Sequence, residues 1–277
     1  MLMHNALAFA ADDDLQPILV RADPDGVAYD RPTDTLFVAD GYSGAVLRIE
    51  GQRQRRIATI DSGGALGTNR IGGLAITPSG TVFVTRLGYG EAGTIFRIEP
   101  DRQPEALERL PRAFWRLGVT YDAAEHALYA TQYLTSRYGA HGGEIVRIDL
   151  VTGEPSTILD GFLRPIGIAK LGQTLVVADA RQRAVFRVDL VAGRAVRRLQ
   201  LVGDIGRPDS VCACSSDSVL VTAFDEETQR GSVRRLWLDG RTRGIASGPW
   251  EPRGVATDGQ RVFVSAHRGG QVLVFAM

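Results

Sequence analysis

One phrase recurs six times along this chain and limits its possible folds more than any other feature. The first copy, PDGVAYDRPTDTLFVADGYSGAVLRIE, covers residues 24–50. It predicts short strands over 26–29, 35–39 and 45–49, because each stretch is rich in β-branched or aromatic residues and is bounded by Asp, Pro, Gly or Ser. The copies follow one another at intervals of about 45 residues. Their anchor positions are Gly26, Gly73, Gly118, Gly167, Ser210 and Gly254.

A strand-rich repeat of this length without a helical pattern is typical of a β-propeller. We therefore expect an all-β, six-bladed β-propeller with four-stranded blades that start near residues 24, 71, 116, 165, 208 and 252. The outermost strands have weaker patterns and are expected at 56–60, 106–110, 156–159, 195–201 and 243–247.

The two ends of the chain complement each other. The last blade has its third strand at 271–275 and then lacks a fourth, whereas an unassigned apolar stretch, LQPILV, stands at 15–20. Pairing these segments would close the ring and remove an exposed sheet edge. The prediction is a single propeller over 15–277, closed by the N-terminal strand, with residues 1–14 as a flexible tail.

The overall charge argues against some classes of partner. Lys and Arg number 32, Asp and Glu also number 32, and the formal net charge is zero. Binding to nucleic acid or to an anionic membrane surface requires clustered positive charge. No apolar stretch reaches membrane-spanning length, and the N-terminus lacks the basic and apolar regions of a signal peptide. We expect a cytoplasmic protein with a small-molecule substrate, no nucleic acid and no membrane, and the oligomeric state is left open.

Blade geometry predicts two rings of residues at one mouth of the central channel, because each first strand begins where each second strand ends. The first ring precedes the anchors and contains Asp25, Gly72, Leu117, Ile166, Asp209 and Arg253. The second ring ends the second strands and contains Asp40, Arg86, Gln132, Asp179, Ala223 and His267.

Two acids of the first ring are the main candidates for chemistry. Asp25 and Asp209 point into the channel from nearly adjacent blades, and Arg253 belongs to the blade between them. Paired carboxylates can hold a divalent cation such as Ca, Mg or Zn, share a proton, or form an Asp–Arg–Asp cluster. His267 can transfer protons near neutral pH. All three readings of the acids remain open from the sequence.

A further set of residues is predicted to bind substrate at the same mouth. Arginines converging on a pore suit a carboxylate, phosphate or enolate, although ion pairing with the acids is the alternative. The blade-three segment TQYLTSRYGAHGG is expected to be a long loop beside the pore. The candidate substrate-binding residues are Arg86, Arg116, Trp115, Gln132, Tyr89, Tyr133, His141 and Asp179, of which Asp179 has loop capping as its alternative role.

Blades one (PDGVAYDRPTDTLFVAD) and five (RPDSVCACSSDSVLVTA) resemble the corresponding blades of the SMP-30/gluconolactonase/luciferin-regenerating family. The resemblance implies a propeller lactonase with a divalent cation that polarises a lactone carbonyl and activates water. Asp25 would occupy the position of the family's Glu and Asp209 that of its Asp. The blade-four ligand position is Ile166, which cannot bind a cation, and Arg116 corresponds roughly to the family's substrate-supporting Asn.

The phrases RPIGIAKLGQTLVVAD and EPRGVATDGQRVFVSAH resemble a second group, the virginiamycin B lyases and NHL-type propellers. That resemblance implies a lyase with a histidine general acid or base, for which His267 is the candidate. The leading interpretation is a gluconolactonase-like hydrolase that acts on a small lactone or other cyclic ester. The alternatives are a lyase or cyclase that uses His267 and arginines without a tightly bound metal, and a non-catalytic binding propeller.

Overall fold

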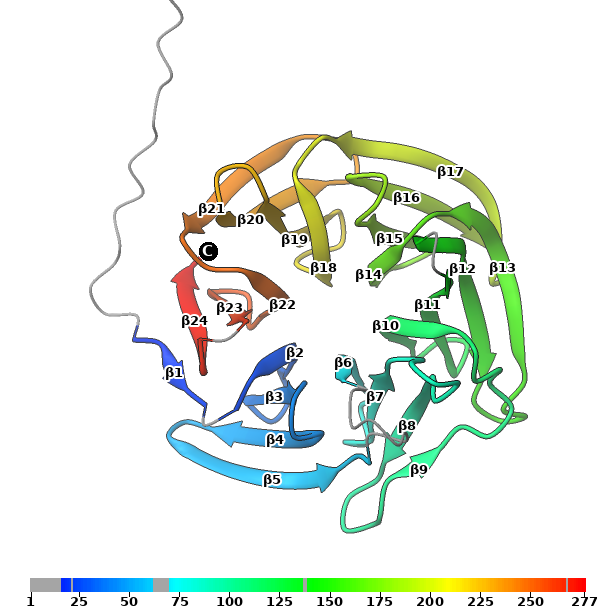
Figure 1. Ribbon diagram of the computed structural model, residues 1–277, viewed down its shortest axis with the longest axis horizontal. Coiled ribbons are helices and arrows are strands. Elements are labelled where there is room, and N and C mark those ends of the chain that lie inside the picture. The colour runs from blue at the N-terminus through cyan, green and yellow to red at the C-terminus, as the bar shows by residue number, and fades with distance from the viewer. Residues whose placement is uncertain (1–15, 21, 62–69, 137–138, 268) are drawn as a thin grey trace, which may run out of the picture.

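In the computed structural model, which describes residues 16–20, 22–61, 70–136, 139–267 and 269–277, six four-stranded sheets surround a central axis (Figure 1). Every sheet is antiparallel, and the described residues form no helix. The described part of the chain therefore offers no long apolar helix that could cross a membrane. The all-β six-bladed propeller predicted from the repeat is confirmed.

Blade one contains β2 (Pro24–Asp30), β3 (Thr35–Asp40), β4 (Ala45–Glu50) and β5 (Arg53–Thr59). Blade two contains β6 (Ile71–Ile76), β7 (Val82–Arg86), β8 (Thr94–Ile98) and β9 (Glu105–Ala106). Blade three contains β10 (Trp115–Asp122), β11 (Ala127–Ser136), β12 (Gly139–Asp149) and β13 (Pro155–Phe162). In each blade the first strand is the innermost one (Figure 1).

Blade four contains β14 (Pro165–Leu171), β15 (Thr174–Asp179), β16 (Ala184–Val191) and β17 (Arg194–Gly203). Blade five contains β18 (Arg207–Ala213), β19 (Ser218–Asp225), β20 (Arg230–Trp237) and β21 (Thr242–Gly248). Blade six contains β22 (Pro252–Thr257), β23 (Arg261–Ala266), β24 (Gln271–Ala276) and, from the other end of the chain, β1 (Ile18–Leu19).

Strand β1 closes the ring. It pairs antiparallel with β24, with Ile18 opposite Val272 and Leu19 opposite Gln271. The next residue, Val20, is 1% exposed and donates its N–H to the carbonyl of Gly270 at 2.9 Å. Closure by the N-terminal strand is thus confirmed, with a strand shorter than the predicted 15–20. The predicted tail 1–14 and residue 15 lie outside the described residues.

Each innermost strand has a register shift at its anchor, as between Ile71 and Leu74 in blade two. The shift brings the anchor against the backbone of the following blade, so that a Cβ on Gly73 would lie 2.2 Å from the carbonyl oxygen of Leu117. Heavy atoms cannot approach that closely, which explains the recurrence of glycine at this position. Blade five has Ser210 instead, and its N–H donates to the hydroxyl of Thr222 at 2.9 Å.

Hydroxyl groups at the ends of some second strands link one blade to the next. Thr85 donates to the carbonyl of Leu117 at 2.9 Å, Thr131 donates to that of Ile166 at 2.7 Å, and Ser265 donates to that of Asp25. The equivalent positions in blades one and four are Ala39 and Ala178. These links hold the carbonyls of first-ring residues and so fix the ring that surrounds the channel.

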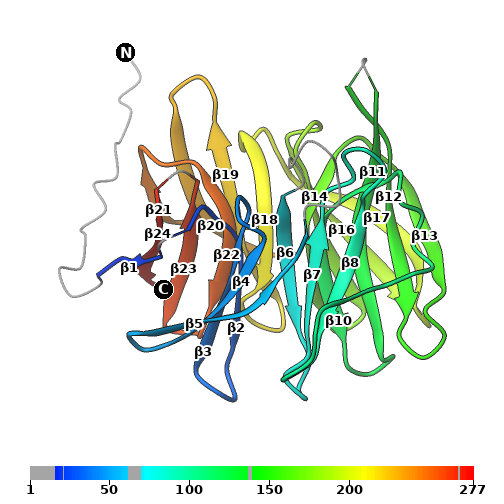
Figure 2. The same cartoon turned by 60° about the horizontal axis from the view of Figure 1, so that its bottom comes forward.

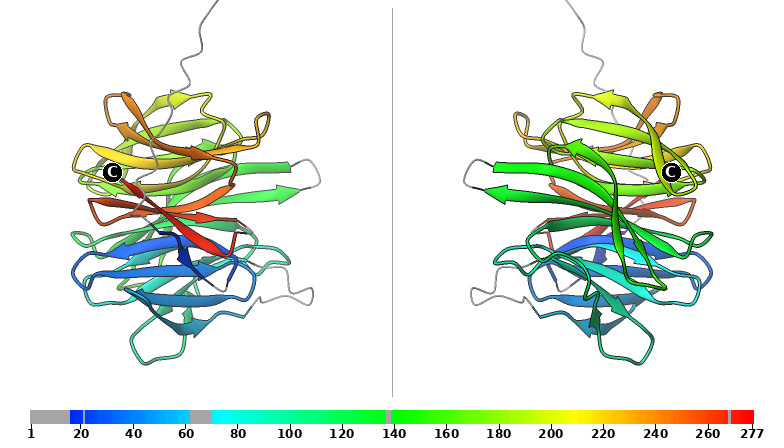
Figure 3. Two further views of the ribbon diagram at one scale, coloured as in Figure 1. Left: turned by 90° about the vertical axis from the view of Figure 1, so that its left-hand side faces the viewer. Right: turned by 90° about the vertical axis from the view of Figure 1, so that its right-hand side faces the viewer.

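The blade-three segment predicted as a loop is a long β-hairpin. Strands β11 and β12 stay paired up to Ser136 and Gly139, with Leu134 opposite His141, after a register shift at Tyr133. The hairpin extends beyond its neighbours on one face of the disc (Figures 2 and 3). The expectation failed because small and polar residues of this segment still make ladder hydrogen bonds, which composition alone does not reveal.

Candidate functional site at the channel mouth

The channel mouth is built from two layers of residues that lie at the start of the innermost strands or just before them. The lower layer is the predicted first ring, one residue before each anchor. An upper layer lies two residues earlier, on the same side of each strand because side chains alternate. Its members are Asp23, Arg70, Trp115, Arg164, Arg207 and Glu251.

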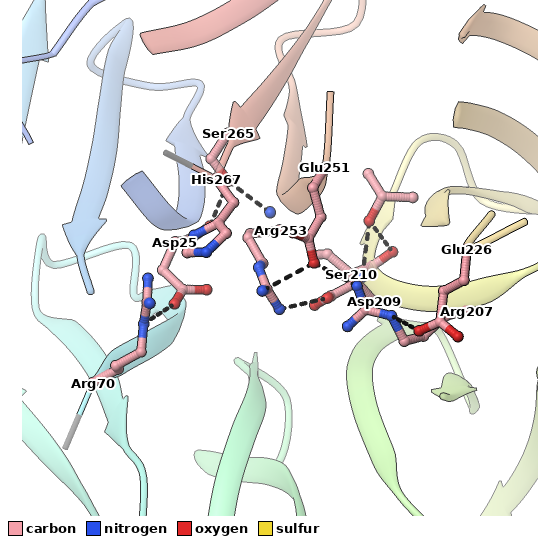
Figure 4. Close-up of polar contacts among 12 residues, drawn as sticks. Asp25, Arg70, Arg207, Asp209, Ser210, Glu226, Glu251, Arg253, Ser265 and His267 are labelled. Atoms are coloured by element: carbon pink, nitrogen blue, oxygen red, sulfur yellow. Dashed lines mark hydrogen bonds and ion pairs between the residues drawn. The ribbon is translucent and has the colours of Figure 1, made fainter. Parts of the chain in front are cut away.

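Arg253 connects the two layers on the side of blades five and six. One nitrogen of its guanidinium, Nη1, lies 3.4 Å from the carboxylate of Asp209, and Nη2 lies 3.0 Å from Glu251. Arg207 also binds Glu251, at 2.5 Å, and lies 3.4 Å from Glu226 (Figure 4). Alternating charges thus form a continuous chain over this half of the mouth.

The other acid of the lower ring, Asp25, has a different partner. Arg70 donates from Nε to Asp25 at 3.1 Å and from Nη2 to Asp23 at 2.8 Å. The Nδ1 atom of His267 lies 3.3 Å from the opposite oxygen of Asp23. The predicted Asp–Arg–Asp cluster is therefore only half formed, because Asp209 pairs with Arg253 whereas Asp25 pairs with Arg70 instead (Figure 4).

Burial controls the titration of both acids. Asp209 is 6% exposed, and burial raises its pKa to about 6, against the opposing charge of Arg253 and with a further increase from Asp25. Burial likewise raises the pKa of Asp25, while Arg70 and Arg253 partly offset the effect. A carboxyl group whose pKa lies near the working pH can accept and return a proton.

The pKa values of two basic residues at the mouth, His267 and Arg253, shift in opposite directions. Burial and then the charge of Arg253 lower the pKa of His267, so its imidazole is neutral at pH 7. Burial also acts to lower the pKa of Arg253. The negative charges of Asp209, Asp25 and Glu251 outweigh this effect, so the pKa of the guanidinium is raised overall. The mouth therefore holds a permanent cation between two titratable acids.

Aromatic side chains form the wall on the side of blades two and three. The ring of Trp115 lies 6.2 Å from that of Tyr89 and 6.2 Å from that of Tyr133, between ring centroids. Tyr133 is 1% exposed, and the guanidinium carbon of Arg164 lies 6.0 Å from its ring centroid. The structure thus brings together Trp115, Tyr89 and Tyr133, three of the predicted substrate-binding residues.

Two arginines predicted to face the mouth do not do so. Arg86 is 7% exposed and donates to the backbone carbonyls of Ala92 at 2.9 Å and Asp61 at 2.7 Å. Arg116 is fully buried and donates to carbonyls of Gly93 and Pro111 at 3.0 and 2.9 Å. Arg86 holds the backbone of blade two to the segment that follows β5 of blade one, and Arg116 holds the backbone where blade two meets blade three, so neither is placed to contact substrate.

Three other residues predicted to bind substrate either have a structural role or lie on the hairpin of blade three. Gln132 is 3% exposed and donates to Glu144. Asp179 is fully buried and accepts hydrogen bonds from the N–H groups of its flanking loops, including those of Leu163 and Arg164 at 2.7 and 3.1 Å. His141 lies exposed on the hairpin of blade three, where its Nδ1 is 3.3 Å from the Gly139 carbonyl. Asp179 thus caps the loop, as its alternative role predicted.

Sequence reasoning placed the lower layer but missed four charged members of the upper layer, Asp23, Arg70, Arg207 and Glu251. A usable signal was present, because each stands two residues before a lower-layer position and therefore faces the same side of an extended strand. His267 follows β23 and sits one residue beyond the ring position, which Ala266 occupies.

The acids do not offer a suitable set of ligands for a divalent cation. A hard cation needs several oxygen donors, yet Asp25 and Asp209 are each bonded to an arginine, and the third position is Ile166. The described residues contain no group of three or more His, Cys, Asp or Glu side chains arranged to hold a metal. The predicted metal role of Asp25 and Asp209 does not fit this arrangement.

Below the mouth, the channel encloses a cavity of about 730 Å³. Asp25, Asp209 and Arg253 line one end of it, and Arg31 and Lys170 line the other. A cavity of this size matches a small-molecule ligand.

Solved structures share this architecture. A gluconolactonase from Xanthomonas campestris superposes with a TM-score of 0.76 at 16% identity, over 99% of this chain and 93% of that chain. A calcium-binding regucalcin from Agrobacterium tumefaciens gives 0.68 at 17% identity, over 96% and 93%. Virginiamycin B lyase from Staphylococcus aureus gives 0.65 at 15% identity, over 95% and 99%. The two predicted resemblances are therefore confirmed in the fold.

At the level of sequence, no family model matches this chain, and no curated protein proves similar to it.

Proposed function

We propose that this propeller is a hydrolase that opens a small lactone or another cyclic ester at the channel mouth. The observation that carries the proposal is the arrangement of Asp209, Arg253 and Asp25, in which two buried acids with raised pKa values flank a charged guanidinium. The similarity in fold to a gluconolactonase supports the class of reaction and leaves the substrate open.

In the proposed reaction Asp209 acts as the general base. It removes one proton from a water molecule while the water oxygen bonds to the ester carbonyl carbon. The carbonyl oxygen becomes negatively charged and is stabilised by Arg253. The ring C–O bond then breaks, the leaving alkoxide takes the proton back from Asp209, and the product is an open-chain hydroxy acid. No step requires a metal ion, in keeping with the donors that the site presents.

The test is hydrolysis of a panel of aliphatic and sugar lactones, followed with a pH indicator. Asp209→Asn should lower kcat by at least about a hundredfold, because proton transfer by a positioned base contributes that much or more. Asp239→Asn is the matched control, since Asp239 lies in the exposed turn between β20 and β21 at the opposite end of blade five. Retention of activity in Asp209→Asn, or no hydrolysis of any lactone by the parent protein, would contradict the proposal.

A second candidate is a lyase that uses His267 as its base. The specific observation in its favour is that His267 has a lowered pKa and lies at the mouth beside Asp23, while virginiamycin B lyase shares the fold. Water labelled with heavy oxygen separates the two reactions, because hydrolysis places the label in the product acid and elimination does not.

A further inference from the structure

The arginines of the mouth differ in whether they have an acidic partner. Arg70, Arg207 and Arg253 each bind two carboxylates, at distances of 2.5 to 3.4 Å. Arg164, the blade-four member of the upper layer, forms no ion pair with any acid in the described parts of the chain. Among the arginines of the two layers within the described residues, Arg164 is therefore the one without an acidic partner.

The backbone of Arg164 is held in place although its guanidinium has no acidic partner. Its N–H donates to the buried carboxylate of Asp179 at 3.1 Å, and its carbonyl accepts from Ala180 at 3.0 Å. The side chain is partly buried and lies over the ring of Tyr133. An arginine fixed in this way loses little further freedom when it binds an anion.

Arg164 also stands close to the proposed chemistry. Its charge is among those that offset the effect of burial on the pKa of Asp209 and of Tyr133. In the upper layer it lies between Trp115 of blade three and Arg207 of blade five. A ligand anion at Arg164 would therefore leave the rest of a small molecule between the aromatic wall and the Asp209–Arg253 pair.

The distribution of charge among the described residues favours one orientation of such a ligand. Beyond Arg207, the mouth carries the acids Glu226, Glu251, Asp209, Asp25 and Asp23, whose neighbouring arginines are shared among them. A second negative group on the substrate would be repelled there and attracted to Arg164.

We propose that the substrate is a small cyclic ester that carries a separate anionic group, and that Arg164 is the specificity-determining residue that binds this group. This inference rests on the proposed function. A carboxylate and a phosphate are both suitable, because guanidinium binds either through paired hydrogen bonds.

The test compares matched lactones that differ only in charge. One pair is a γ-butyrolactone that bears a carboxylate beside the ring oxygen and the corresponding carboxamide; the other is phosphorylated gluconolactone and gluconolactone. The parent protein should show about tenfold to a hundredfold higher kcat/KM for one or both charged members, the scale of one charge-assisted hydrogen-bonded pair. The lactone pair in which the charged member is preferred identifies the anion as a carboxylate or a phosphate.

Arg164→Gln should abolish this preference, because it should raise KM for the charged member by about tenfold or more relative to the neutral member of the same pair. Arg183→Gln is the matched control in the same blade, where exposed Arg183 pairs with Asp204 at 3.0 Å. If neither charged lactone is preferred, or if Arg164→Gln keeps the preference, the inference is wrong while the hydrolase proposal stands.

If no lactone is hydrolysed, the hydrolase proposal fails and binding decides the role of Arg164. Calorimetric titration of the parent protein with the two charged lactones should then give heat that Arg164→Gln abolishes and Arg183→Gln retains. Equal binding by the Arg164→Gln protein, or no binding by the parent protein, would overturn the inference.

Discussion

The guanidinium of Arg253 lies 3.4 Å from the carboxylate of Asp209, although the two residues are 44 positions apart in the chain. The same guanidinium binds Glu251 of its own blade at 3.0 Å. This relationship joins blades five and six at the mouth and keeps a charged base beside a buried acid. It also sets the first three predictions.

The stability of the folded protein should depend on the titration of Asp209. Its pKa rises from 3.8 to about 6 on folding, so the folded state retains a proton that the unfolded chain releases. The stability contributed by this group is full below about pH 4 and is lost as the pH rises through about 6. Relative to Asp209→Asn, the parent protein should lose about 3 kcal/mol over this range, measured by urea unfolding at several pH values. No such change is expected relative to Asp239→Asn, and a constant difference for Asp209→Asn would contradict the assignment.

Catalysis should follow the ionised form of the same acid. If Asp209 is the base, kcat/KM for a hydrolysed lactone should rise with pH and reach half of its maximum near pH 6. In Arg253→Gln this midpoint should move upward, because the charge that opposes the effect of burial is lost. A profile that is flat between about pH 5 and pH 8 would exclude Asp209 as the base.

Removal of the shared cation should destabilise the fold. Arg253→Gln leaves Asp209 without its guanidinium partner, and Glu251 keeps only Arg207. We expect the free energy of unfolding to fall by about 3 kcal/mol at neutral pH and by less near pH 5, where Asp209 can take up a proton. Arg241→Gln, which breaks an exposed pair with Asp239, should change it by less than about 1 kcal/mol. Equal effects of the two variants would show that the mouth pair adds nothing to stability.

Adjacent glycines in blade two provide a sharp test of the anchor. A Cβ on Gly73 would meet the Leu117 carbonyl at 2.2 Å, whereas one on Gly72 would meet its first neighbour, the Thr85 hydroxyl, at 3.5 Å. Gly73→Ala should therefore lower the free energy of unfolding by about 3 kcal/mol, and Gly72→Ala by less than about 1 kcal/mol. Urea unfolding of both variants tests this expectation. A larger loss of unfolding free energy in Gly72→Ala than in Gly73→Ala would refute the steric explanation for the anchor glycine.

The ring closure predicts a contrast between two neighbouring residues of the N-terminal segment. Val20 is 1% exposed within a core shared by blades one and six, whereas Leu19 is 72% exposed. Val20→Ala should cost about 2 kcal/mol of unfolding free energy, and Leu19→Ala almost nothing. The comparison uses thermal or urea unfolding, and equal losses would mean that the apolar contacts of Val20 do not secure the closure.

The sequence was informative where the repeat itself carries the structural information. Anchors such as Gly73 mark the channel because the backbone of the next blade excludes a side chain there, and every blade repeats that constraint. The same repeat located Asp25, Asp209 and Arg253 in one ring.

The sequence was less informative about which partners the charged ends of long side chains contact. Arg86 and Arg116 occupy ring-adjacent positions, yet their guanidinium groups turn to backbone carbonyls, because a buried arginine must satisfy its donors. Arg70 and Glu251 were missed because they stand just before β6 and β22, where only their spacing from Gly72 and Arg253, and no apolar alternation, marks them. The hairpin of blade three was missed because ladder hydrogen bonds, rather than apolar alternation, pair Leu134 with His141 and the residues beyond them.

Ala39 and Ala178 mark two seams of the ring that have no hydroxyl at the linking position. Read blade by blade, the residue there is Ala, Thr, Thr and then Ala, Thr, Ser, although Thr222 bonds to Ser210 of its own blade. The seams between blades three and four, from Thr131 to Ile166, and between blades six and one, from Ser265 to Asp25, both carry a hydroxyl contact. A chain cut between blades three and four would therefore yield two fragments that each present complementary edges at both ends, the arrangement needed for reassembly of an intact disc from separate pieces.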